Sequence, residues 1–212
     1  MEGRAEGTRP RPHPSPIPYP SIPPPMLDRY ATPPRNAATL AARRAALLDQ
    51  LGWLEDEATA LVPLLSDLPA WAVDQAPLET QLSAKETFAA LAALDRDVYP
   101  AMIARLQAED APEVETPDPL PRPEGANDRK LDALLADLRA ARADLRGTLE
   151  AVPAEAWARP VVLDGTETDL YGLALAVVQR DADHLKALAY RLHEADLRPR
   201  TPSSDLPTPP GS

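Results

Sequence analysis

The sequence contains no cysteine, a single phenylalanine and only three histidines among its 212 residues. Without cysteine, disulfides, thiolate nucleophiles and zinc–thiolate sites are all excluded. No stretch approaches the roughly 20 consecutive apolar residues of a membrane-spanning helix, and the N-terminal segment lacks the apolar run of a secretory signal. We therefore expect a cytoplasmic protein that does not insert into a membrane.

Positive charge is also scarce. The chain has 22 Lys and Arg against 33 Asp and Glu, which gives a formal net charge of −11. Such an excess of negative charge repels phosphate backbones and anionic lipid headgroups. We therefore expect neither a nucleic acid nor a membrane as a partner.

Proline is abundant, but it is confined to particular segments. Of the 27 prolines, 21 lie in residues 1–35, 109–126 and 196–212. A proline-rich composition favours extended polyproline II structure and cannot bury enough surface to fold. We therefore predict a disordered tail at 1–35, one folded domain at 36–195 and a second disordered tail at 196–212. An alternative role for the first tail is to recruit a partner that binds proline-rich segments.

The region between the tails has the hydrophobic period of amphipathic helices. Ser83 and Glu86 have the spacing of a capping box, in which each side chain satisfies a backbone donor of the other residue. Helices of this length need one another to bury their apolar stripes, so the pattern predicts an all-α four-helix bundle. The expected helices cover about 36–66, 83–108, 127–152 and 166–195.

The proline-rich segment 109–126 separates the second and third helices. At about 3.1 Å per residue in polyproline II, it is long enough to span most of a helix that rises about 1.5 Å per residue. A crossover of this kind would make the second and third helices parallel. We therefore predict an up-down-down-up order instead of a plain meander.

Three stretches give the sequence a family resemblance. They are Leu68-Pro69-Ala70-Trp71, Leu82-Ser83-Ala84-Lys85-Glu86 with Asp95-Arg96-Asp97-Val98-Tyr99, and Val178-Gln179-Arg180-Asp181-Ala182-Asp183-His184-Leu185. In these stretches the sequence resembles the DinB/YfiT-like family, four-helix bundles of up-down-down-up topology that include metal-dependent thiol transferases. The resemblance covers about residues 36–195.

The resemblance also implies where a metal would bind. Members with a working site place one histidine on the second helix and two, four residues apart, on the fourth. These positions correspond here to Ala90, Arg180 and His184. The other two histidines are His13, in the first tail, and His193, beyond the pair. We therefore expect a degenerate metal site, with no three-histidine centre and no cofactor.

The remaining polar residues suggest ligand binding. Our hypothesis is that Arg180 and His184, with Asp181 beside them, form a small pocket for an anion or a carboxylate. An unpaired buried charge is costly, so a buried Arg180 would need a carboxylate partner, and Glu86 and Asp97 on the second helix are the candidates. Alternatively, Arg180 extends along its aliphatic stem to solvent, and His184 is an ordinary packed residue.

Several functions stay open at this stage. The favoured interpretation is a noncatalytic or diverged bundle that binds a small molecule or self-associates, with a homodimer formed through the alanine-rich first helix. The alternative is a metal-dependent hydrolase or thiol transferase with substituted ligands, namely Asp181 and His184 with Asp95 or Asp97. The aromatic residues Trp53, Trp71, Trp157 and Tyr171 are expected to close the ends of the bundle.

Overall fold

The computed structural model describes residues 36–66 and 68–197, with the side chains of 194–197 excepted. Both predicted tails therefore lie almost entirely outside the described residues, and the predicted domain boundaries stay predictions. No helix in the described part of the chain is long and apolar enough to cross a lipid bilayer.

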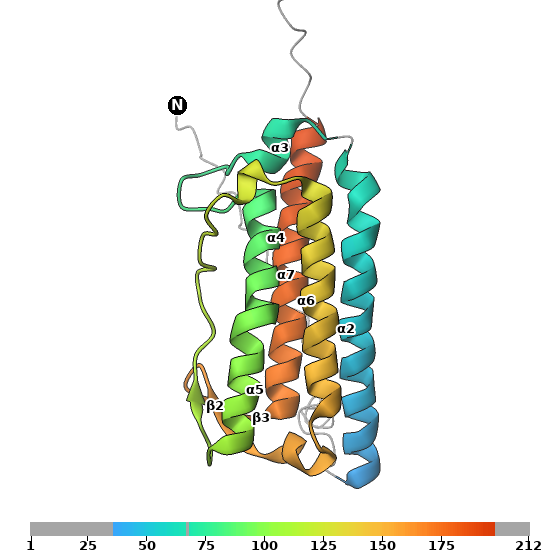
Figure 1. Ribbon diagram of the computed structural model, residues 1–212, viewed down its shortest axis with the longest axis vertical. Coiled ribbons are helices and arrows are strands. Elements are labelled where there is room, and N and C mark those ends of the chain that lie inside the picture. The colour runs from blue at the N-terminus through green and yellow to red at the C-terminus, as the bar shows by residue number, and fades with distance from the viewer. Residues whose placement is uncertain (1–35, 67, 198–212) are drawn as a thin grey trace, which may run out of the picture. The chain divides into compact units, whose positions relative to one another are not determined.

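Four long helical segments form the body of the fold (Figure 1). Following the chain in Figure 1, the first segment rises, the second and third both descend, and the fourth rises again. The predicted four-helix bundle and its up-down-down-up order are thus confirmed. The segments are α2 (Ala37–Ser66), α4 (Ala84–Ala93) continued by the π-helical segment η2 (Leu94–Val98) and α5 (Tyr99–Ala108), α6 (Leu131–Ala151) and α7 (Leu170–Leu197).

Three short helices complete the helical content of the described residues: α3 (Ala70–Asp74) and the 3₁₀ turns η3 (Ala126–Asp128) and η4 (Ala154–Ala158). The capping box predicted at the start of α4 is present. The Ser83 hydroxyl accepts a hydrogen bond from the Glu86 amide at 3.0 Å, and Glu86 Oε2 accepts one from the Ser83 amide at 2.7 Å. Both residues are buried, so this helix begins at a fixed residue inside the fold.

The sequence did not predict a small three-stranded sheet, and the all-α prediction holds only for the body of the fold. Strand β2 (Pro160–Leu163) pairs in parallel with β1 (Glu113–Val114) and antiparallel with β3 (Thr166–Asp169). Asp164 and Gly165 both have positive φ, 50° and 76°, which suits a two-residue hairpin turn. The fourth helix, expected from residue 166, therefore begins only at Leu170.

This sheet anchors the lower end of the crossover in Figure 1. The backbone amide and the hydroxyl of Thr116 both donate to the Asp164 carboxylate, each at 2.7 Å. Arg159 donates to the carbonyls of Gln107 and Glu109, where α5 ends. One hairpin thus secures both the end of the second helical segment and the first residues of the crossover.

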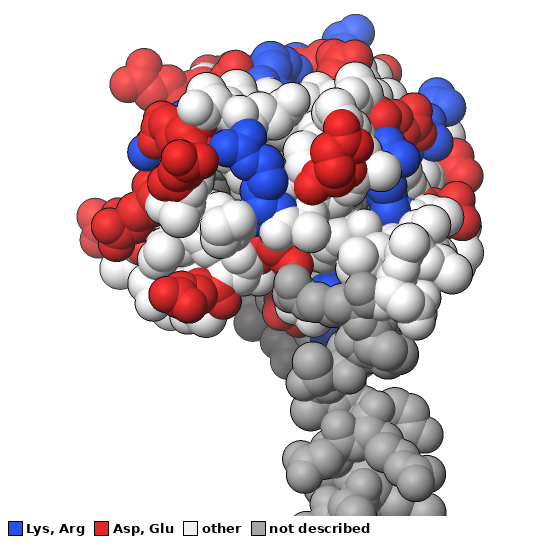
Figure 2. All heavy atoms as spheres, turned by 90° about the horizontal axis from the view of Figure 1, so that it is seen from below, with Lys and Arg blue, Asp and Glu red and all other residues white. Residues whose placement is uncertain are grey.

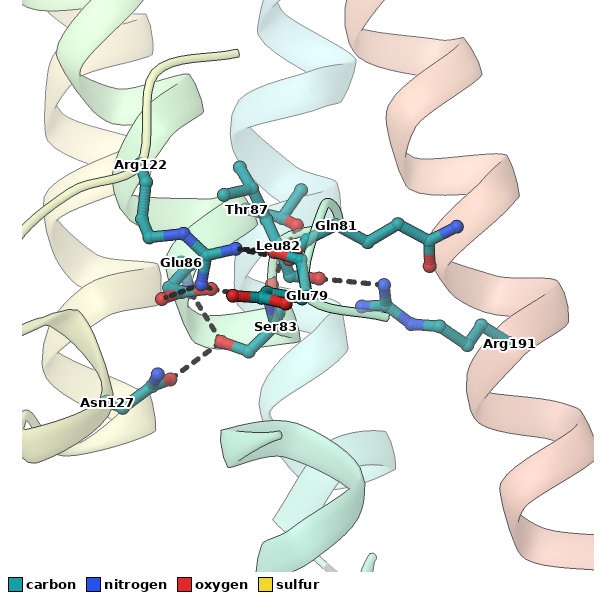
Figure 3. A network of polar contacts seen from close by, with 9 residues as sticks. All are labelled: Glu79, Gln81, Leu82, Ser83, Glu86, Thr87, Arg122, Asn127 and Arg191. Atoms are coloured by element: carbon teal, nitrogen blue, oxygen red, sulfur yellow. Dashed lines mark hydrogen bonds and ion pairs between the residues drawn. The ribbon is translucent and has the colours of Figure 1, made fainter. Parts of the chain in front are cut away.

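The upper end of the crossover is held by the network in Figure 3. The Arg122 guanidinium lies 2.9 Å from Glu86 Oε1, and it also donates to the carbonyls of Glu79 and Gln81. The Ser83 hydroxyl bonds to Asn127 Oδ1 at 2.6 Å. The crossover is therefore tied to the first turn of α4 before it enters α6.

The core divides into two clusters of buried side chains. One, the η4 cluster, includes Leu51, Ile103, Leu145 and Trp157, and the other, the α3 cluster, includes Val73, Phe88, Leu138 and Leu188. The prediction that four aromatic residues close the ends holds for two of them. Trp157 and Tyr171 are buried with ring centroids 5.0 Å apart, but Trp53 and Trp71 are 70% and 43% exposed.

Candidate functional site

A buried arginine lies at the centre of the bundle. Arg142 occupies the position on α6 between Leu138 and Leu145, so helical spacing directs its side chain inward. It is 1% exposed, and its Nη1 donates to the Leu54 carbonyl of α2 at 2.6 Å. Its Nη2 contacts Asp181 of α7 directly, and its Nε lies 3.7 Å from Asp95 Oδ2.

Arg142, Asp95 and Asp181 form a polar layer between the two clusters of the core. Along α6, Leu138 belongs to the α3 cluster and Leu145 to the η4 cluster. Along α7, Leu185 and Val177 divide between the clusters in the same way, on either side of Asp181. Every long helical segment contributes a side chain or a carbonyl group to this layer.

Asp95 joins the layer from the π-helical segment η2. A π-helix inserts an extra residue into a turn and changes the directions of the side chains around it. Leu94 and Asp95 are neighbours in sequence, yet they are only 1% and 6% exposed. Both residues thus face the interior, as the adjacent residues Leu134 and Leu135 do in the regular helix α6.

The polar layer contains two carboxyl groups and one guanidinium, so their protonation states are coupled. Burial and the charge of Asp181 raise the pKa of Asp95 to about 8, and Arg142 only partly opposes this rise. Burial also raises the pKa of Asp181, against the opposing effect of Arg142. Because Asp181 contacts Arg142 directly and Asp95 lies farther away, we assign the charge to Asp181 and the proton to Asp95 at neutral pH.

Arg180 and His184 lie close to this layer on α7. Arg180 directly precedes Asp181, and His184 follows Asp181 by about one helical turn. Burial raises the pKa of Tyr99 to about 12, although the charge of Arg180 and a hydrogen bond with it act in the opposite direction. Arg180 Nη1 is buried and has no hydrogen-bond partner among the described residues. Burial and Arg180 lower the pKa of His184, while Asp181 and Asp118 of the crossover act in the opposite direction.

The structure separates the other predicted site residues from this group. Glu86 belongs to the capping box and pairs with Arg122, and Asp97 is exposed on η2. Neither one therefore serves as the carboxylate partner of Arg180. Ala90 is fully buried in α4 and contributes only a methyl group.

Arg142 is the residue that sequence reasoning missed. The signal was present, because position 142 continues the apolar stripe of α6 from Leu138 to Leu145 and Leu149. The stripe of the second helix was ambiguous at residues 94 and 95, and the structure shows that both are buried. A charged residue at a stripe position of one helix predicts opposite charges at stripe positions of its neighbours.

A separate apolar groove of about 430 Å³ lies where the start of α2 meets η4, and its lining includes Leu40, Leu48 and Tyr171. Figure 2 shows the molecule from this end of the bundle. Acidic side chains and a few basic ones alternate there over an uncharged surface. The described residues on this face therefore present no continuous basic patch of the kind that binds nucleic acids.

The fold defines a class of protein, a four-helix bundle with parallel middle helices. It is similar to a solved structure described as "YfiT from Bacillus subtilis is a probable metal-dependent hydrolase with an unusual four-helix bundle topology". The TM-score is 0.58 and the sequence identity 12%, over 78% of this chain and 91% of that one. No family model and no curated protein matches the sequence. The likeness therefore establishes the DinB/YfiT-like fold and leaves the activity open.

The residues at the expected metal positions do not fit a bound metal. Ala90 has no donor atom, Arg180 brings a positive charge, and Asp181 is already in contact with Arg142. Among the described residues, no three His, Asp or Glu side chains are arranged to hold a metal ion. The groups around His184 are thus suited to ion pairs and hydrogen bonds.

The protonation of Asp95 predicts how stability depends on pH. Its folded pKa of about 8 lies above the ordinary 3.8, so the folded protein holds a proton that the unfolded chain releases. This contribution to stability is complete below about pH 4 and is lost as the pH rises through about 8. Asp95→Asn should give a shallower loss of Tm between pH 5 and 8.5 and a higher Tm at pH 8.5, measured by circular dichroism.

Asp97→Asn is the matched control, because this exposed carboxylate lies two residues farther along the same segment and should leave the pH slope unchanged. Equal slopes for Asp95→Asn and the wild type would show that Asp95 does not hold the proton.

Proposed function

We propose that this bundle works without a metal and binds a small molecule that carries one carboxylate, through Arg180 and His184. The observation that supports this most directly is the state of Arg180. Its Nη1 is withdrawn from solvent without a hydrogen-bond partner among the described residues, and the neighbour that acts on its guanidinium by a hydrogen bond, Tyr99, is a neutral phenol. A buried guanidinium donor without an acceptor costs free energy, which a bound anion would recover.

The balance of charge favours a single negative charge on the ligand. The proton on Asp95 makes that group neutral, Asp181 and Arg142 neutralise each other, and the lowered pKa of His184 keeps its imidazole neutral. The charge of Arg180 is then left over. One carboxylate would compensate it.

The surroundings also argue against a ligand of higher charge. Arg180 and His184 are both half-buried, so they are within reach of solvent. Asp118 of the crossover and Asp183 of α7 act electrostatically on His184. These acidic groups would repel a phosphate or a dicarboxylate more strongly than a monoanion.

Anion binding can be followed on His184 itself. With three histidines in the chain, the imidazole signals are few enough to resolve by nuclear magnetic resonance. Titration of the full chain with acetate or benzoate should shift the His184 signals with saturation and leave those of His193 in place. Arg180→Ala should weaken binding about tenfold or more, because a hydrogen bond to a charged group is lost.

Arg139→Ala is the control for this titration, since Arg139 lies on the exposed side of α6 and its loss should leave the affinity unchanged. Inorganic phosphate tests the charge argument and should bind more weakly than acetate. An affinity for acetate that Arg180→Ala does not alter would refute the proposed site.

The alternative is a metal-dependent hydrolase or thiol transferase that uses substituted ligands, and the similar structure is described as a probable metal-dependent hydrolase. It predicts metal bound through His184 and Asp181. After incubation with Zn, Ni or Mn and removal of free metal, we expect well under one metal per chain by elemental analysis, with the same value in Asp181→Asn/His184→Ala. Stoichiometric metal that the double variant loses would establish the alternative.

Self-association is the second proposed property, and two exposed side chains support it. Trp53 and Leu64 are 70% and 69% exposed, and they lie three turns apart on one side of α2. Exposed apolar side chains on one side of a helix can pack against the same helix of a second copy. Light scattering after size exclusion should give the mass of a dimer for the wild type and of a monomer for Trp53→Ser/Leu64→Ser. Tyr190→Ser, which removes an exposed aromatic ring from α7, should stay dimeric.

A further inference from the structure

The polar layer has the composition of a cation site, although its cation is a side chain. Two carboxyl groups and one carbonyl oxygen, from three different helical segments, surround the Arg142 guanidinium. The side chains of Arg142, Asp95 and Asp181 are all at least nine-tenths buried. Carboxylate and carbonyl oxygens from separate elements are also what hard metal cations require.

The contacts are unequal, which shows how the cation is held. One guanidinium nitrogen contacts Asp181, and a second donates to the Leu54 carbonyl at 2.6 Å. The third, Nε, makes no hydrogen bond with any described group and lies 3.7 Å from the Asp95 carboxyl. Asp181 and Leu54 thus fix the guanidinium, and the Asp95 carboxyl group faces its third nitrogen from η2.

The position of the layer gives this cation a function in the assembly of the fold. The layer lies between the α3 and η4 clusters. At this level the four helical segments are joined by polar contacts, whereas above and below it they are joined by apolar packing. The buried Asp181 carboxylate at this level would lose its hydration without compensation, unless a cation stood beside it. A guanidinium meets this requirement permanently, because it neither dissociates nor loses its proton.

We propose that Arg142 is the resident internal cation of this protein, a guanidinium that joins Asp181 of α7 to Asp95 of η2 in place of a bound metal ion. Its removal should leave a site at the same two carboxyl groups that accepts a free guanidinium ion. This inference does not depend on anion binding at Arg180, because it is tested by stability alone.

The first test is chemical rescue of Arg142→Ala in the full chain. Without its cation the variant should melt about 10 °C below the wild type. Guanidinium chloride at about 5–20 mM, on the order of a hundredth of denaturing concentrations, should raise this Tm by several degrees, whereas equal sodium chloride should not. The wild type should gain nothing, because its own guanidinium fills the site.

Arg146→Ala is the matched control, because Arg146 lies one turn farther along α6 and pairs with Glu55 near the surface. This variant should show no guanidinium-specific gain. A rise in Tm of equal size in Arg146→Ala and Arg142→Ala would overturn the proposal.

The second test covers an Arg142→Ala variant too unstable to melt cooperatively. Arg142→Met alone leaves the buried Asp181 carboxylate and its neighbour Asp95 without a cation, whereas Arg142→Met/Asp95→Asn/Asp181→Asn also replaces both carboxyl groups by neutral amides. The triple variant should therefore be more stable than the single one and insensitive to guanidinium. A triple variant less stable than Arg142→Met would mean that Arg142 is not the partner of these carboxyl groups.

Discussion

The contact between Arg142 and Asp181 is the interaction on which the centre of this bundle depends. It joins α6 to α7, and through the Leu54 carbonyl and Asp95 it also reaches α2 and η2. Loss of either member would leave a buried charge without compensation, which is far more costly than the loss of a surface ion pair. The same contact fixes the rotation of α7, and so determines where Arg180 and His184 lie.

Much of the fold could be predicted from the sequence, because local signals agreed with the global arrangement. The capping box at Ser83 fixed the start of the second helix, and the proline-rich link supplied the length that parallel helices require. The sheet was missed for a local reason. Asp164 and Gly165 form a hairpin turn, but the threonines that follow were read as the first turn of a helix.

The candidate site was less predictable, because it depends on which side chains face one another across the bundle. Asp181 was recognised as a polar residue on an apolar stripe, yet its partner lies 39 residues earlier in the chain. Glu86 was a reasonable partner for Arg180 by helical position, but Arg122 reaches it from the crossover. A long arginine side chain can reach any of several carboxylates. The hydrophobic period of the sequence therefore does not predict which carboxylate an arginine pairs with.

The parallel middle helices also determine when the domain can fold during its synthesis. The first helix, α2, packs mainly against α6, and α4 does so as well, so both early helices have their principal neighbour in a segment made much later. Arg44 near the start of α2 illustrates the distance, because it bonds to the carbonyl of a residue 106 positions onward. During synthesis, the apolar stripes of α2 and α4 would therefore stay exposed until α6 left the ribosome. The first half of this domain thus depends on the second half in order to fold.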